Sequence, residues 1–420
     1  MSTMGHALGY DAAPAFTTPA RFFVTAPLFG VVAGLFLLVA PDLLASRWTP
    51  GALALTHLIT VGFMLMIMVG ALFQILPVVA GAVLPAANAV AAVVHASLTA
   101  GAAALVWGLA AMQPDVLLAA AWLLGFGFTL FFVVAAVGLW RAPVSQATPR
   151  DLRLALICFG IAIMLGLLLA MVLARGLGLP LFTLLKLHVG WAWLGGAGIL
   201  LAATSWVVVP MFQITPNYPD LVTRYWAIGA CTALVLWSVA VLADVSYAEL
   251  MLVLMLLALA ATYTITTLRL QQRSRKSTAD STIRAFQLGM ASLMAGLVCV
   301  LIAHYHDHAV WPILGGVLIL HGGFVSVIQG MLYKIVPFLA WLHLNQAGLK
   351  APNMKKLQPD APIRKQLRSH MVALAALVVA VPSGSTLLVR AAGILVLVEF
   401  AWLFKNMIGV IRAYRLARDA

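Results

Sequence analysis

Three histidines recur at almost equal intervals in a chain that is otherwise largely apolar. His57, His188 and His321 are 131 and 133 residues apart. Each opens an apolar run of helical character that closes in proline, and an arginine stands 35 to 37 residues before each of them. Imidazole is a common protein ligand of transition metals and of haem iron. The spacing therefore predicts one membrane unit used three times, with inward-facing imidazoles that ligate haem or a metal.

A second group of histidines stands in the segment His-Tyr-His-Asp-His at 304–308. In an extended segment alternate side chains share a face, so the imidazoles would lie on one side. Three imidazoles and a carboxylate suit Cu(II), Zn(II) or Ni(II). His304, His306 and His308 are therefore candidate metal ligands, and the plainer alternative is a solvated loop that binds nothing.

The composition identifies the medium around these histidines. Mean hydropathy is +1.06, and only 9% of the 420 residues are charged, which indicates a polytopic protein embedded in a lipid bilayer. Net charge is +13, but the basic residues stand in short loops beside apolar runs, so no nucleic acid is expected as a partner. The three cysteines form no Cys-x-x-Cys-His sequence, which excludes covalently attached c-type haem.

Loops rich in proline, glycine or charge divide the chain into apolar runs of about 20 residues, the length that crosses a bilayer as a helix. We expect an all-α polytopic membrane protein with twelve transmembrane helices in a threefold pseudo-symmetric (4+4+4) bundle. Only Pro-Ser-Gly-Ser at 382–385 separates the last two helices. The predicted spans are 22–40, 52–78, 88–110, 116–140, 152–174, 181–210, 226–243, 247–270, 284–303, 311–340, 369–387 and 389–410.

Residues 21–420 are expected to form a single transmembrane domain, with repeats at about 21–140, 150–270 and 281–410. Residues 1–20 lack the charged segment and short apolar core of a cleaved signal and are expected to form a disordered cytoplasmic tail. Most lysines and arginines follow even-numbered helices. Because cytoplasmic loops carry the excess of positive charge, we expect both termini in the cytoplasm and the protein in a bacterial inner membrane.

This orientation sets the depth of the three repeated histidines. At about 1.5 Å per residue, His57 would lie about 7 Å below the outer face, His188 about 10 Å and His321 about 15 Å. All three would share the outer half of the membrane, which favours a common site. Glu399 is the clearest acid inside a span. Further histidines toward the cytoplasmic side are expected in structural or surface roles, namely His95, His343 and His370.

The layout and the local sequence resemble the large subunit of the haem–copper oxidases, in particular the C-type (cbb-type) enzymes. Residues 56–77 are similar to helix 2 of that superfamily, whose histidine ligates the low-spin haem. Residues 188–226 are similar to helix 6 and its following turn, where the histidine binds copper; here Pro210 and a Tyr-Pro pair at 218–219 follow. Residues 330–337 are similar to the end of helix 10.

The chain departs from the oxidases at their oxygen-reducing centre. The predicted seventh helix, 226–243, has no histidine where the family carries a paired-histidine copper motif. His321 stands alone where the family has His-x-His, about one turn closer to the next proline. The resemblance is therefore to a reduced, stand-alone member, similar in architecture to the NnrS family of haem- and copper-containing membrane proteins associated with nitric oxide stress.

This resemblance implies a b-type haem protein for electron transport, or for nitric oxide binding and detoxification. It implies one or two haems, with His57 and His321 as axial ligands and His188 as a ligand of copper or of a second haem. An oxidoreductase activity would fit, without the complete centre of a terminal oxidase, and a homo-oligomer is compatible with it. Three cations on the outer side could pair with haem propionates: Arg47, Arg175 and Lys186.

Two other functions fit the same residues. In a copper or other metal transporter, the segment 304–308 would capture the ion and pass it to Met64 and His57, since thioether and imidazole groups bind copper. Methionines at 64, 66 and 68 cannot all share one face of a helix. In an assembly or scaffold protein, the same helical frame would hold no metal.

Overall fold

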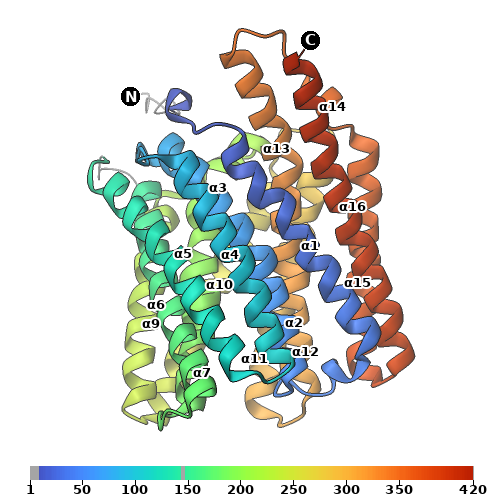
Figure 1. The fold of residues 1–420 in the computed structure, drawn as a ribbon. Helices are drawn as coiled ribbons and strands as arrows, with labels where there is room; N and C mark the ends of the chain where they lie inside the picture. Colours follow the sequence, from blue (N-terminus) through green and yellow to red (C-terminus); the bar gives the residue numbers. More distant parts are fainter. Residues whose placement is uncertain (1–8, 143–146, 420) are drawn as a thin grey trace.

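The computed structural model describes residues 9–142 and 147–419, so the first eight residues of the expected tail lie outside the described residues. The described part contains twelve helices long and apolar enough to cross a membrane, which confirms the predicted number and the all-α, multi-pass class. They lie side by side along one direction (Figure 1). Their bounds are α1 (Thr17–Val39), the α2–η3–α3 span (Pro50–Ala80), α4 (Ala87–Ala110), α5 (Pro114–Trp140), α6 (Ala147–Arg175), the α7–η4–α8 span (Leu181–Gln213), α9 (Asp220–Leu242), α10 (Ser246–Gln272), α11 (Ser281–Tyr305), the α12–η5–α13 span (Val310–Gln346), α15 (Asp360–Ser383) and α16 (Thr386–Asp419). Short turns are η1 (Tyr10–Ala12), η2 (Pro41–Leu44) and α14 (Met354–Leu357).

Ordinary sequence signals begin and end these helices. Thr49 stands just before the second span, and its hydroxyl oxygen accepts a hydrogen bond from the Ala52 N–H at 3.1 Å. Asp280 caps α11 in the same way, accepting from the Ile283 N–H at 3.1 Å. Gly384, with φ of +61°, separates α15 from α16 as the Pro-Ser-Gly-Ser segment predicts. Between these signals the chain stays helical, because a membrane offers the backbone no other hydrogen-bond partners.

The largest differences from the predicted boundaries are in the last two helices. α15 begins at Asp360 and α16 ends at Asp419, each nine residues beyond its predicted limit. Both extensions carry several basic residues, so hydropathy marks only the apolar part of each helix. Helix propensity and packing between the two helices continue the helical backbone past that part.

The end of the bundle at which α1 begins and α16 ends is here called the terminal face; it is at the top of Figure 1. Residues 9–16, which the sequence predicted to be part of a disordered tail, contact this face. The Gly9 N–H donates to the Val78 carbonyl at 3.1 Å, and the His343 Nε2 lies 2.8 Å from the Pro14 carbonyl oxygen. These contacts hold the start of the described chain against α3 and α13.

The three spans that carry the repeated histidines are the most buried ones. In their most apolar stretches, 78% of residues are buried in Pro50–Ala80, 61% in Leu181–Gln213 and 56% in Val310–Gln346, against 17–50% in the other nine described spans. These three helices therefore form the inside of the bundle, and the others separate them from lipid. Side chains that point from them toward one another are shielded from both lipid and water.

Each inner span also departs from regular α-helix. The π-helical segments among the described residues all lie in these spans: η3 (Leu58–Leu65), η4 (Trp191–Gly198) and η5 (Val317–Val325). A π-helix inserts extra backbone and turns side chains away from regular α-helical positions, and such segments are frequent at functional sites. The first segment begins directly after His57, the second three residues after His188, and the third contains His321.

Candidate functional site

All three repeated histidines line one cavity. Its volume is about 960 Å³, and its wall is almost entirely apolar, from aliphatic and aromatic side chains of all three inner spans. His57 and His188 each stand seven residues after the first residue of their spans, and His321 stands eleven residues after Val310. Counted along the helices, His57 and His188 are therefore equally far from the starts of their spans, and His321 is about one helical turn further from its own.

Charged and aromatic side chains surround the cavity where it approaches the opposite face. The exposed rings of Trp48 and Phe182 meet edge to face with their centroids 5.4 Å apart. The Arg47 guanidinium lies 4.5 Å from the Trp48 ring centre, and the Lys186 ammonium is 2.8 Å from a Glu249 carboxylate oxygen. Arg47 and Lys186 both line the cavity. Arg175, the third cation expected from the sequence, does not line it.

Hydrogen bonds fix the His57 ring so that one nitrogen is free. Its Nδ1 lies 2.8 Å from the Leu53 carbonyl oxygen, one turn earlier in α2. A carbonyl oxygen can only accept, so Nδ1 carries the proton and the neutral ring has its lone pair on Nε2. This is the tautomer in which a histidine ligates a metal through Nε2, with Nδ1–H held by a backbone carbonyl.

His188 is held in the same way, but by a different helix. Its Nδ1 lies 2.8 Å from the carbonyl oxygen of Ala162 in α6. The ring packs over Gly166, where a Cβ atom would be 3.0 Å from His188 Cε1. The absent side chain thus makes room for the ring, and Nε2 again has its lone pair free for the cavity.

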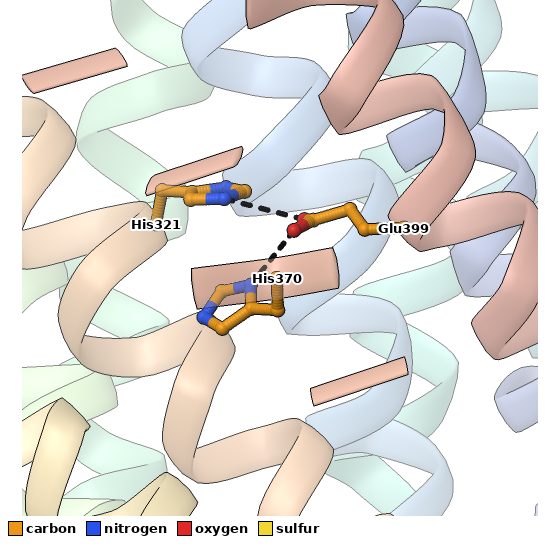
Figure 2. Close-up of side chains that lie close together, drawn as sticks. All are labelled: His321, His370 and Glu399. Carbon is orange, nitrogen blue, oxygen red and sulfur yellow. Dashed lines mark hydrogen bonds and ion pairs between the residues drawn. The ribbon is translucent and has the colours of Figure 1, made fainter. Parts of the chain in front are cut away.

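His321 has a different environment from the other two. Its ring is buried, and its Nε2 lies 3.2 Å from the Oε1 atom of Glu399 in α16 (Figure 2). The second carboxylate oxygen, Oε2, accepts from His370 Nδ1 in α15 at 2.9 Å. The two imidazole rings are tilted by 38°, with centroids 4.9 Å apart. Three helices thus bring two imidazoles and one carboxylate together in the interior.

Further polar contacts orient this group. His370 Nε2 lies 2.7 Å from the Ser326 hydroxyl oxygen, one residue after η5. The Gln366 amide donates to Gln329 Oε1 at 3.1 Å, one turn of α15 before His370. Within the described residues, the group His321, His370 and Glu399 is the one set of three or more histidine, cysteine or acidic side chains whose ligand atoms all lie within 4.8 Å.

The other histidines are placed as follows. His304, His306 and His308 are exposed at the opposite face, and none belongs to that close group. His95 Nε2 lies 2.8 Å from the Thr25 hydroxyl. His343 bridges two backbone carbonyls at the terminal face, which agrees with its expected structural role.

His370 is the site residue that the sequence reasoning assigned to a structural or surface role. One signal could have found it: His370 stands 13 residues before the end of α15, and Glu399 stands 13 residues after the start of α16. In an antiparallel helix pair joined by a short turn, equal distances from the turn give equal heights in the bundle. Applied to the predicted break at 382–385, that rule pairs the two residues.

The methionine pattern behaves as its spacing predicts. Met64 and Met68 line the cavity, whereas Met66 lies in the packed interior of the bundle. Residues four apart share a helix face and residues two apart do not.

The chain matches no protein-family model and no curated protein. Assignment of a function therefore depends on the geometry of the cavity and of the histidines around it.

Proposed function

We propose that this protein binds haem b in the cavity between its three inner spans and serves in electron transfer or in nitric oxide binding and detoxification. The main support for this proposal is the arrangement of His57 and His188. Both line one large apolar cavity, and both have Nδ1 bound to a backbone carbonyl and Nε2 free. A cavity of about 960 Å³ is at the upper end of pockets that enclose small molecules and cofactors.

His57 and His188 are the axial ligands that we propose for this haem. The sequence resemblance predicts His57 with His321, whereas the geometry favours His188 because Glu399 Oε1 lies only 3.2 Å from His321 Nε2. An imidazole nitrogen that lies against a carboxylate oxygen is less accessible to haem iron than one with no such neighbour. His57 and His188 also stand equally far from the first residues of their spans, and both line the cavity.

The residues at the opposite face fit the polar edge of such a group. Haem is apolar over most of its surface and carries two propionates at one edge. Arg47 and Lys186 provide cations where the cavity approaches solvent, and charge-assisted hydrogen bonds to carboxylates are among the stronger polar contacts. The aliphatic lining excludes water from the remainder of the cavity. Bound haem would supply one-electron redox chemistry and an iron that binds small gases.

The proposed activity stops short of oxygen reduction. α9, the seventh span, contributes no histidine to the cavity, so the copper ligands of an oxidase are missing there. An oxidoreductase without a binuclear centre, or a carrier of nitric oxide or of electrons, agrees better with these side chains.

We also propose that the bundle is a threefold pseudo-symmetric arrangement of four helices each, in a bacterial inner membrane with both termini in the cytoplasm. Each π-helical segment packs on the helix before its span: η3 on α1, η4 on α6 and η5 on α11. A glycine allows the close approach in all three cases. A Cβ atom would lie 2.5 Å from Phe29 if added to Gly62, 2.6 Å from Phe159 if added to Gly196, and 2.6 Å from Leu293 if added to Gly323. The concentration of basic residues at the terminal face supports the orientation.

The experiment is a reduced-minus-oxidised visible spectrum of the detergent-purified protein, expressed with sufficient haem, with metal analysis of the same sample. A b-type α-band is expected. His57→Ala and His188→Ala should each remove or halve the bound haem, whereas His304→Ala should leave it unchanged.

Other results would redirect the assignment. Equal haem loss from His57→Ala and His304→Ala would refute the site. A colourless protein containing copper would favour the transporter, and a colourless, metal-free one would favour the scaffold.

A further inference from the structure

We propose that His321, His370 and Glu399 bind one divalent first-row transition-metal ion, such as Zn(II), Fe(II) or Cu(II). The site lies between the α12–η5–α13 span, α15 and α16 (Figure 2). It does not rest on the haem proposal, because His57 and His188 have no part in it.

Two buried polar atoms that make no hydrogen bond carry this proposal. His321 Nε2 and Glu399 Oε1 lie 3.2 Å apart, yet their orientation makes no hydrogen bond, and both atoms are buried without any hydrogen-bond partner. Buried polar groups without partners are rare because they lose the hydration that the unfolded chain enjoys. A cation between them would satisfy both lone pairs at once.

The distances suit a shared ion. Zn(II) binds histidine nitrogen and carboxylate oxygen at about 2.0–2.1 Å, so two ligands on one tetrahedral ion stand about 3.3 Å apart. The separation of His321 Nε2 from Glu399 Oε1 is 3.2 Å. His370 Nδ1 is the third donor, 2.9 Å from the same carboxylate.

Ser326 completes the arrangement as a positioning residue. When Nδ1 of His370 gives its lone pair to the metal, the ring proton must stand on Nε2, which is 2.7 Å from the Ser326 hydroxyl oxygen. Nε2–H then donates to that oxygen. Histidine ligands of metals usually have their second nitrogen held in this way.

The donor set selects the class of ion. Two imidazoles and one carboxylate suit iron, copper or zinc and leave a coordination position open, whereas magnesium and calcium require mainly oxygen ligands. The single negative charge of Glu399 neutralises half of a divalent cation. The ion would lie next to the cavity, because His321 also lines it.

The test begins by removing the exposed histidines that would bind metal themselves. In a background with His304→Ala, His306→Ala and His308→Ala, chelator-treated, haem-free protein is titrated calorimetrically with Zn²⁺. One ion per chain is expected.

Substitutions then locate the ion. Glu399→Gln and His370→Gln should each weaken binding more than about 100-fold, and Ser326→Ala about 10- to 100-fold. His95→Gln should leave it unchanged, because His95 is a partly buried histidine that does not belong to this group. Gel filtration and the melting temperature of each variant report whether it has folded.

A second measurement needs no substitution in the site. Cu²⁺-loaded protein with the loop histidines replaced should give an electron paramagnetic resonance spectrum with hyperfine coupling to two imidazole nitrogens. Absence of stoichiometric Zn²⁺ binding, a folded Glu399→Gln variant that binds as tightly as its parent, or a copper spectrum without two nitrogens would each overturn the proposal. Loss of haem from the His57→Ala or His188→Ala variants would leave these results intact, so the two proposals fail separately.

Discussion

The crossing of α1 and α16 at two glycines allows a quantitative test of the packing that positions Glu399. A Cβ atom on Gly34 would lie 2.4 Å from the Leu397 nitrogen and 2.7 Å from the Gly393 carbonyl oxygen. These are backbone atoms of α16, so no side-chain rotation can relieve the contact. Small residues of this kind let membrane helices approach closely.

Gly34→Ala should therefore push the two helices apart. Overpacking of a close contact costs about 1–3 kcal/mol in free energy of unfolding. Gly160→Ala in α6 is the matched control, because a Cβ there meets nothing within 4 Å. Both changes gain the same preference of alanine for helix, about 0.5–1 kcal/mol, so the difference between the variants isolates the clash.

The assay is reversible unfolding in mixed micelles, followed by circular dichroism. Gly34→Ala is expected to be less stable than Gly160→Ala by about 1–3 kcal/mol. Because Glu399 is six residues beyond Gly393 on α16, the same variant should also weaken Zn²⁺ binding. Equal unfolding free energies for the two variants would show that α1 and α16 do not meet at this crossing.

Two further predictions concern the cavity and the terminal face. Gly166→Leu should displace the His188 ring, because Cε1 of that ring would be only 3.0 Å from the new Cβ atom. The haem α-band should then shift or disappear. The control variant Gly160→Leu should retain the α-band of the wild type, because a Cβ atom there meets nothing within 4 Å. At the terminal face, burial acts to raise the pKa of Asp280, but hydrogen bonds from Lys276 and the Ile283 N–H and the charge of Lys334 leave that pKa below 3.8. A lowered carboxyl pKa adds stability that is present above about pH 4 and is lost as pH falls through the folded-state pKa. Wild type should therefore be more stable than Asp280→Asn above pH 4, by at most about 1 kcal/mol because the group is partly exposed. This difference should shrink below pH 4. Unfolding midpoints of both proteins between pH 3 and 7 measure it, and an advantage that grows toward pH 3 would contradict the assignment.

Sequence alone determined the class of the protein and the number of its spans. Apolar runs of membrane length leave helix as the structure that satisfies the backbone, so composition and loop signals were sufficient. The same local chemistry predicted the break at Gly384, because a residue with positive φ favours glycine. It could not predict that α15 and α16 continue nine residues further, since hydropathy reports the solvent around a helix and not its length.

The repeated histidines were found from their spacing, and their presence around one cavity agrees with a common site. Only the tertiary structure decided how they differ. The Nδ1–H of His188 donates to a carbonyl oxygen in another helix, and each π-helical segment packs on the helix before its span, so neither contact has a local sequence signal.

The group His321, His370 and Glu399 most clearly separates what the sequence determines from what only the tertiary structure decides. His321 and Glu399 are visible in the sequence as ionisable side chains inside apolar runs, whereas His370 stands at the start of one, just after a basic segment. Their meeting within 4.8 Å depends on the rotation of three helices about their own axes. That rotation is set by side-chain packing across the whole bundle, at Gly34 and Gly393 among other places. The sequence does not reveal it, because hydropathy is nearly uniform around a membrane helix and carries little information about which face points inward.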